Sequence, residues 1–249
     1  MGTLNGKVAV VTGASKGLGA GIAKKLAHEG ASVVVNYSSD KAGAERVVAE
    51  ITGKGGKAIV VKANVANGAD AKNLIAETVK AYGPVDVLVN NAGVFEFAPL
   101  GEITPEHFHR QFDINVLGLL LVSQEALAHF NPKGGAIVNI SSGVSTVTPP
   151  GSAVYSATKG AVDAIGGVLA KELAGKHIRV NTVNPGMVPT EGVKAGGFHE
   201  SELKDVVLAV TPLARLGEVH EIADAVAFFA SDASSYVTGE TLHVTGGWH

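Results

Sequence analysis

The chain has 249 residues and a net charge of only −3, and 46% of its residues are hydrophobic. This composition excludes a disordered chain, and the weak acidity argues against a nucleic-acid-binding protein. There is no cysteine, so a disulfide framework, a thiolate metal site and a cysteine nucleophile are also excluded. No apolar run approaches the roughly 18 residues of a membrane span, and we expect a cytoplasmic protein without a membrane partner.

Short runs rich in β-branched residues alternate along the chain with longer segments of helical periodicity. The expected strands are Lys7–Thr12, Ser32–Asn36, Ala58–Lys62, Val85–Val89, Ala136–Ile140, Ile178–Val183 and Thr241–Val244. The expected helices are approximately 17–29, 40–53, 69–82, 105–130, 152–174 and 218–230. Because the strands are almost continuously apolar, the sheet should be buried on both faces. The alternation predicts right-handed βαβ units.

These units predict an α/β fold with a doubly wound parallel seven-stranded sheet and helices on both faces. No change of composition and no linker divides the chain, so we expect one domain over residues 1–249. The only long irregular stretch is 185–200, which is rich in glycine and bounded by proline. A loop of this length in a compact domain usually serves binding, and we expect a substrate loop.

A glycine-rich turn lies between the first expected strand and the first expected helix. The segment runs from Thr12 to Gly19 and has glycine at positions 13, 17 and 19. Glycines at such a turn bring backbone N–H groups and a helix N-terminus against a pyrophosphate. A tight turn without a ligand is the alternative, and the position directly after an apolar strand favours the binding site.

The GxxxGxG spacing resembles that of the classical short-chain dehydrogenase/reductase family, whose other motifs follow in order. The fourth strand is followed by Asn90-Asn91-Ala92-Gly93, and the next helix contains Asn115. The fifth strand is followed by Ser142, and the helix after it begins with a YxxxK motif formed by Tyr155 and Lys159. The sixth strand is followed by Asn184-Pro185-Gly186. The resemblance covers the whole chain. It implies a single-domain Rossmann fold and an oxidoreductase that transfers a hydride between a nicotinamide cofactor and a substrate carbonyl or alcohol.

A second YxxxK, formed by Tyr37 and Lys41, shows that this motif alone is weak. Thirteen residues before Tyr155 stands Ser142, at the carboxyl end of an expected strand, where open α/β sheets bind ligands. Thirteen residues before Tyr37 stands Lys24, inside an expected helix. We therefore expect Tyr155 to be the catalytic tyrosine.

The resemblance implies a catalytic set of Asn115, Ser142, Tyr155 and Lys159. Lys159 lies one helical turn from Tyr155, where its charge should favour the phenolate and lower the pKa of Tyr155. Ser142 would hydrogen-bond the substrate oxygen, and Asn115 would hold a water that links Lys159 to solvent. Three of these residues also have a plain structural alternative: Tyr155 as a core aromatic, Ser142 as a turn hydroxyl and Asn115 as a buried amide.

The end of the second strand bears on the cofactor. An NAD site has an acidic residue there for the ribose 2′-OH, whereas this chain has Asn36, Tyr37 and Ser38, with Lys16 in the glycine turn. We expect NADP(H) rather than NAD(H), and an Asn36→Asp substitution should lower the NADPH preference. The expected cofactor contacts are Gly13, Ser15, Lys16, Gly17, Leu18, Gly19, Asn36, Tyr37, Ser38, Asn64, Val65, Asn91, Ala92, Gly93, Tyr155, Lys159, Pro185, Gly186, Val188 and Thr190.

The expected substrate walls are mostly apolar and predict a ketone or secondary alcohol with an apolar body. They are Val94, Phe95, Phe97, Val144, Thr146, Met187 and the 187–200 loop, with Glu96 and His199 nearby. Two further possibilities are a 3-oxoacyl-carrier-protein reductase and a glucose 1-dehydrogenase-type sugar dehydrogenase, both similar in overall pattern. A family epimerase or lyase, and a non-catalytic NADP(H)-binding regulator, are also open.

An acidic carrier protein would need a basic approach to the pocket, for which only His129, Lys133 and Lys171 are candidates. No metal is expected, because His107 and His109 lie two residues apart and would point away from each other on a helix. The segment Thr238 to Gly247 resembles the last strand and tail of the family, which implies a homotetramer.

Overall fold

The computed structural model describes residues 2–191 and 202–249. Seven strands form one parallel sheet in the order β3-β2-β1-β4-β5-β6-β7. They are β1 (Val8–Val11), β2 (Ser32–Tyr37), β3 (Lys57–Lys62), β4 (Val87–Asn90), β5 (Gly135–Ile140), β6 (Ile178–Pro185) and β7 (Thr241–Val244). The strand order changes direction between β1 and β4, which confirms the predicted doubly wound sheet.

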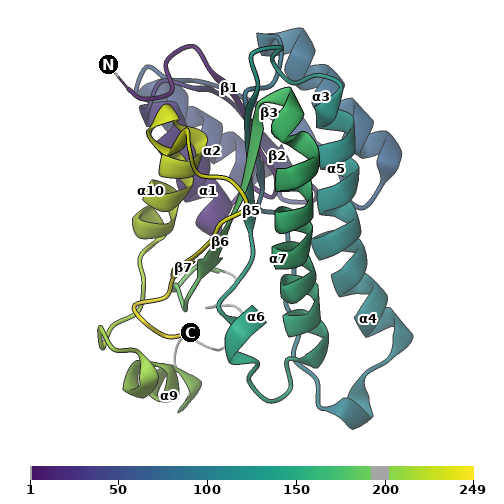
Figure 1. Ribbon diagram of the computed structural model, residues 1–249, viewed down its shortest axis with the longest axis vertical. Helices are drawn as coiled ribbons and strands as arrows, with labels where there is room; N and C mark the ends of the chain where they lie inside the picture. The colour runs from purple at the N-terminus through teal and green to yellow at the C-terminus, as the bar shows by residue number, and fades with distance from the viewer. Residues whose placement is uncertain (1, 192–201) are drawn as a thin grey trace.

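Helices cover both faces of this sheet (Figure 1). One layer holds α1 (Gly17–His28), α2 (Lys41–Gly53) and α10 (Val219–Ala230), and the other holds α3 (Gly68–Tyr82), α5 (Gly118–Leu127) and α7 (Ala153–Leu173). Successive residues of a strand point to opposite faces, so Val33 and Val35 of β2 join the core under α1 and α10, whereas Val34 joins the core under α3 and α5. The continuous apolar strand runs reflect these two cores.

The helix expected over 105–130 is continuous from Pro105 to Leu127, but it is not α-helical throughout and it ends early. It consists of α4 (Pro105–Phe112), a π-helical turn over Asp113–Leu117 and α5. A π-turn inserts an extra residue into the helix and changes the direction of its side chains, which the apolar periodicity does not reveal. The helix also ends earlier than expected, because Phe130 leaves it and forms an isolated bridge with Val85, which the sequence had placed in β4.

Two short helices that the sequence did not predict, α6 (Val144–Val147) and α9 (Glu202–Val210), lie at the same end of the molecule as the C-terminus (Figure 1). Three 3₁₀ turns, Leu100–Glu102, Ala174–Lys176 and Asp232–Ser234, were also not predicted. Of the expected loop 185–200, Pro185 belongs to β6, and 192–200 lie outside the described residues. Among the described helices, none is long and apolar enough to cross a membrane.

Candidate active site

The glycine turn is packed against the segment that follows β4. Gly13 has a φ of +61°, and a Cβ added to it would lie 2.8 Å from Cα of Ala92. A Cβ on Gly19 would lie 2.4 Å from the carbonyl oxygen of Gly13. The Nδ2 of Asn91 donates to the carbonyl oxygens of Thr12 and Gly13 at 2.8 and 3.1 Å. The two predicted motifs are therefore packed against each other, and close backbone approach requires glycine at positions 13 and 19.

The N-terminus of α1 already holds an anionic group. The backbone N–H of Gly17 donates to Oε2 of Glu191 at 2.9 Å. Glu191 comes from the segment after β6 and follows Thr190, which lines the cavity described next. A free backbone donor at the positive end of a helix dipole is the usual binding place for a phosphate. The carboxylate contact shows that this turn fits an anionic ligand such as a pyrophosphate.

A cavity of about 460 Å³ runs along the glycine turn and the ends of β2, β3, β4 and β5. Of the expected cofactor contacts, it is lined by Gly13, Ser15, Lys16, Gly17, Leu18, Gly19, Asn36, Tyr37, Ser38, Asn64, Val65, Asn91, Ala92, Gly93, Tyr155, Lys159 and Thr190. The other three, Pro185, Gly186 and Val188, line the neighbouring cavity. Residues that the sequence missed include Ser39, Asp40, Ala63, Ile114, Ile140 and Ser141.

Asn36 does not present its side chain to this cavity as the cofactor argument assumed. The residue is only 1% exposed, its Nδ2 donates to the carbonyl oxygens of Val61 and Ala63, and its Oδ1 accepts from the N–H of Gly13. The side chain thus ties β2 to β3 and to the glycine turn. The sequence could not show this, because the orientation depends on which strand lies beside β2.

The exposed side chains at this edge are Lys16, Ser38 and Ser39. One carboxylate also lines the cavity, that of Asp40, and it accepts from the N–H of Gly43 as the N-cap of α2. On the adenine side of the expected site, the Oδ1 of Asn64 accepts from the N–H of Ala66 at 3.2 Å. The side chains open to a ligand at this edge are therefore those of Lys16, Ser38 and Ser39, and not that of Asn36.

The four expected catalytic residues come together at the carboxyl ends of β4 and β5. The π-turn carries Asn115, whose Nδ2 donates to Val94 O at 2.8 Å and to Thr158 Oγ1 at 3.0 Å, and whose Oδ1 accepts from Val94 N at 2.8 Å. The Nζ of Lys159 donates to Ile140 O at 2.9 Å. Asn115 thus fixes the segment after β4, while its water-relay role stays a prediction.

The electrostatics of the tyrosine differ from the expectation. Burial raises the pKa of Tyr155 to about 12, while its hydrogen bond with Ser142 acts in the opposite direction. Lys159 Nζ lies 5.8 Å from the centre of the Tyr155 ring, and burial lowers the pKa of Lys159 to about 8 against the opposing charge of Asp163. The predicted lowering of the Tyr155 pKa by Lys159 is therefore wrong in this structure. Tyr155 is a neutral phenol at pH 7.

The competing motif at Tyr37 and Lys41 has a different environment. Tyr37 is buried in the wall of the first cavity, and Lys41 is exposed and pairs with Glu45 at 3.4 Å. Tyr155 instead lines both this cavity and a second one. The geometry agrees with the choice of Tyr155.

The second cavity has a volume of about 500 Å³ and adjoins the first at Tyr155. Of the expected substrate walls, Phe95, Phe97, Val144 and Met187 line it, and His199 lies outside the described residues. Val94 lines the first cavity, and Thr146 lines neither because its hydroxyl donates to Gly143 O. The sequence missed Leu18, Pro149, Pro150, Val207 and Trp248, which come from distant parts of the chain.

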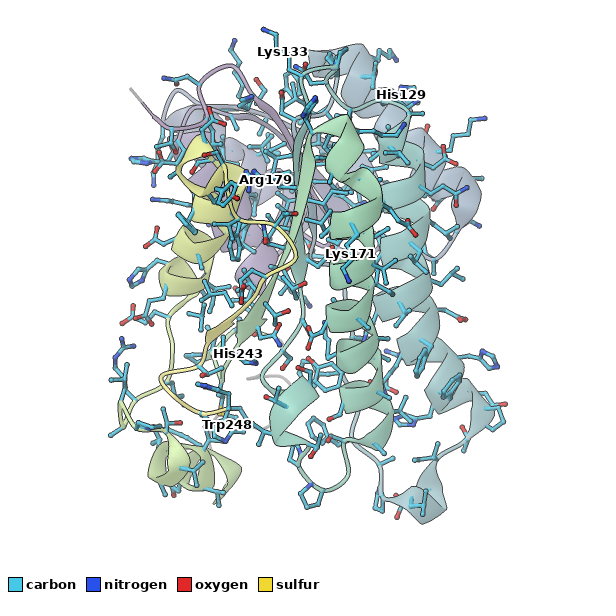
Figure 2. The ribbon with its side chains drawn as sticks, in the orientation of Figure 1. His129, Lys133, Lys171, Arg179, His243 and Trp248 are labelled. Carbon is cyan, nitrogen blue, oxygen red and sulfur yellow. The ribbon has the colours of Figure 1, made fainter. Side chains whose placement is uncertain are left out.

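The basic residues expected to receive a carrier protein do not surround this cavity. Figure 2 shows His129 and Lys133 at the end of the molecule opposite to Trp248, and Lys171 stands in the last turn of α7. A separate expectation concerns His107 and His109, which we do not expect to form a metal pair. The Nε2 of His107 is 3.0 Å from Nε2 of Gln111. Among the described residues, no group of three or more possible metal ligands gathers.

Three comparisons show which known proteins this chain resembles. Residues 13–249 match a family model described as enoyl-(acyl carrier protein) reductase. An uncharacterised oxidoreductase of Methylorubrum extorquens is 56% identical over 247 residues, covering 99% of both chains. A 3-oxoacyl-[acyl-carrier-protein] reductase of Staphylococcus epidermidis is 42% identical, covering 98% of this chain and 99% of the relative. A blue fluorescent protein from a metagenomic library, solved with NADPH, has a TM-score of 0.92 at 38% identity, with 99% of both chains covered.

Proposed function

Because the chain belongs to the short-chain dehydrogenase/reductase family of oxidoreductases, we propose that it interconverts a ketone and a secondary alcohol with NADP(H), and that Tyr155 is the general acid and base. The observation that carries the proposal is the position of Tyr155. Its side chain borders both the cavity along the glycine turn and the mainly apolar cavity beside it. A proton donor at that border can reach a carbonyl oxygen that faces the cofactor.

The residues of the site support a proton transfer between Tyr155 and the substrate oxygen. Bound NADPH supplies the hydride for the carbonyl carbon. Tyr155 is protonated at neutral pH and donates its phenolic proton to the ketone oxygen, and the Ser142 hydroxyl hydrogen-bonds the same oxygen. The phenolate that forms faces the ammonium group of Lys159, 5.8 Å from the ring centre. Oxidation of the alcohol runs through the same groups in reverse.

Three features support NADP(H) as the cofactor. Lys16, Ser38 and Ser39 offer one positive charge and two hydroxyl groups at the edge of the first cavity. Among the described residues that line this cavity, the one carboxylate belongs to Asp40, and it is engaged as a helix cap. The related metagenomic protein was solved with NADPH. Charge-assisted hydrogen bonds to a 2′-phosphate contribute about 1.5–3 kcal/mol each.

The second cavity favours a ketone with an apolar body over a sugar. The hydroxyl groups among its described lining residues belong to Ser141, Ser142, Tyr155 and Thr190, and Ser141 already donates to Lys159 O. A sugar buried there would leave hydroxyl groups without partners, and each such group would weaken binding by about 1–3 kcal/mol. This speaks against a glucose 1-dehydrogenase-type activity.

A 3-oxoacyl-carrier-protein reductase is the second candidate, because the staphylococcal relative carries that name and the family model is named for an enoyl reductase that also acts on acyl carrier protein. Comparison of a 3-oxoacyl thioester on its carrier protein with the same acyl group on a small thiol distinguishes the two candidates. A general ketone reductase has no preference for the carrier-bound form. A non-catalytic regulator would consume no NADPH with any ketone.

The test of the central role is Tyr155→Phe, which removes the phenolic oxygen and keeps the ring. Turnover should fall by about 10²-fold or more, as is typical for a lost general acid, while NADPH binding stays within about two-fold. Tyr37→Phe is the matched control from the competing motif and should leave turnover largely intact. A Tyr155→Phe variant that keeps most of its activity would disprove the assignment.

We also propose a homotetramer. Among the exposed large apolar side chains, one group stands on α4, α5, α7 and the π-turn (Phe108, Leu117, Leu120 and Val168), and another stands on α10, β7 and the segment between them (Phe228, Tyr236 and Leu242). Exposed apolar clusters of this kind mark protein interfaces. Two different sets fit the two interfaces of a tetramer with three twofold axes, and sedimentation equilibrium measures its mass.

A further inference from the structure

The cavity beside Tyr155 is rich in aromatic side chains. Four of its sixteen described lining residues are aromatic, Phe95, Phe97, Tyr155 and Trp248, although aromatic residues make up only 5% of the chain. A random set of this size would hold about one. No charged side chain is among those sixteen residues. The cavity is therefore built to contact rings rather than ions.

Two of these aromatics stand on a segment that buried amides hold in place. Backbone groups of Val94 pair with Asn115, as described above, and backbone groups of Glu96 pair in the same two-way manner with the side chain of Gln111. The amide of Gln111 donates to Glu96 O and accepts from Glu96 N, both at 3.2 Å, and Gln111 is completely buried. The backbone of 94–96 therefore has a fixed position without being part of a strand or helix.

The fixed backbone aims two rings at the catalytic tyrosine. The ring centres of Phe95 and Phe97 lie 6.0 and 6.2 Å from that of Tyr155, at interplanar angles of 51° and 52°. Tilted pairs at this spacing are attractive. They place an aromatic surface beside the ring of the tyrosine that we propose as the proton donor.

The remaining aromatic, Trp248, reaches the cavity from the segment after β7. Gly246 and Gly247 have φ values of +66° and +94°, which turn the chain back toward the sheet. A Cβ on Gly247 would lie 2.8 Å from Cγ of Pro212, and the N–H of Leu213 donates to Gly246 O at 3.1 Å. Figure 2 shows Trp248 between α9 and α6. The turn is thus packed against its surroundings, and it sets the position of the indole.

From these walls we propose that the preferred substrate is a ketone that carries an aromatic ring, with the ring packed against Phe97 and Trp248 and the carbonyl oxygen at Tyr155 and Ser142. This inference rests on the proposed ketone reduction and specifies its substrate class. Phe97 and Trp248 are the specificity-determining residues, and Gln111 is a positioning residue for the segment that carries Phe97.

A matched pair of ketones isolates the contribution of the ring. In 2-tetralone and 2-decalone the carbonyl group occupies the same place in the same bicyclic skeleton, it is not conjugated with the ring, and only one ring differs in aromaticity. Each aromatic pair adds about 2- to 12-fold in affinity beyond the burial of area. We therefore expect kcat/KM with NADPH to be about five-fold or more higher for 2-tetralone.

The variants Trp248→Leu and Phe97→Leu keep an apolar side chain and remove a ring. Each should lower the ratio of kcat/KM for 2-tetralone to that for 2-decalone by about three-fold or more. The control is Tyr82→Leu, which removes an aromatic ring at the end of α3 that lines neither cavity, and its ratio should equal that of the unaltered protein. Equal kcat/KM for the two ketones, or a ratio that neither cavity variant changes, would overturn the inference and leave ketone reduction standing.

A binding measurement separates this inference from the proposed reaction. Trp248 is the only tryptophan of the chain, so its fluorescence reports directly on this cavity. With NADP⁺ present, which cannot reduce a ketone, 2-tetralone should change the Trp248 emission and bind about five-fold or more tightly than 2-decalone. If 2-tetralone binds in this way but neither ketone is reduced when NADPH is supplied, the aromatic cavity is supported and the proposed ketone reduction is refuted. No emission change with 2-tetralone, or equal affinities, would refute the aromatic cavity.

Discussion

Replacing Asn36 by aspartate tests whether this side chain selects the cofactor or holds the sheet together. Its Nδ2 group donates to Ala63 O at 3.0 Å and to Val61 O at 3.3 Å, and it is also 3.4 Å from Tyr37 O. Asn36→Asp puts a carboxylate oxygen in place of this donor, so that it faces carbonyl oxygens. Its other oxygen still accepts from the N–H of Gly13, which is 3.0 Å from Oδ1 in the unaltered protein.

The loss of the donor leaves buried carbonyl groups unpaired, which lowers the free energy of unfolding by about 1–3 kcal/mol. When the uncompensated buried charge is included, the typical total loss of folding stability is about 3–5 kcal/mol. This is a large part of a folding free energy of about 5–15 kcal/mol. Because burial favours the protonated acid, the pKa of the introduced carboxyl is higher in the folded than in the unfolded state. Stability is therefore lost as the pH rises above about 4 toward the folded-state pKa.

Urea unfolding followed by circular dichroism measures this loss at pH 5 and pH 8, and we expect the greater loss at pH 8. The matched control is Ser38→Asp, which adds a carboxylate to an exposed residue that lines the same cavity. It should leave stability within about 0.5 kcal/mol and weaken NADPH binding by about ten-fold. If Asn36→Asp is as stable as the unaltered protein and shifts preference toward NADH, the inward orientation of Asn36 is refuted.

Two further substitutions probe the anion contact and the lysine. Glu191→Gln removes the negative charge that accepts from the N–H of Gly17. NADPH should therefore bind about five-fold more tightly, as measured by a fluorescence titration. An unchanged Kd would show that the Glu191 carboxylate and the cofactor phosphates do not compete. Asp163→Asn removes the charge that raises the pKa of Lys159, which should bring that pKa below about 8. The high-pH decline of kcat/KM for ketone reduction should then begin at lower pH, and an unshifted profile would contradict the coupling.

The sequence alone determined the features that depend on near neighbours in the chain. Continuous apolar runs identified the strands of a sheet buried on both faces, and the glycines at 13, 17 and 19 marked the turn at its edge. The four-residue spacing of Tyr155 and Lys159 placed both on one face of a helix, and the structure has them on α7. These features follow from local backbone geometry, which periodicity records.

Only the tertiary structure decided where side chains point at the edge of the sheet. The amide of Asn36 turns inward because β3 lies beside β2 and supplies carbonyl acceptors. Trp248 reaches the substrate cavity because the turn at Gly246 and Gly247 packs against Pro212, far away in the sequence. The pKa of Tyr155 is raised because its burial outweighs its hydrogen bond with Ser142. Each of these depends on groups that folding brings together from distant segments, and no local spacing contains that information.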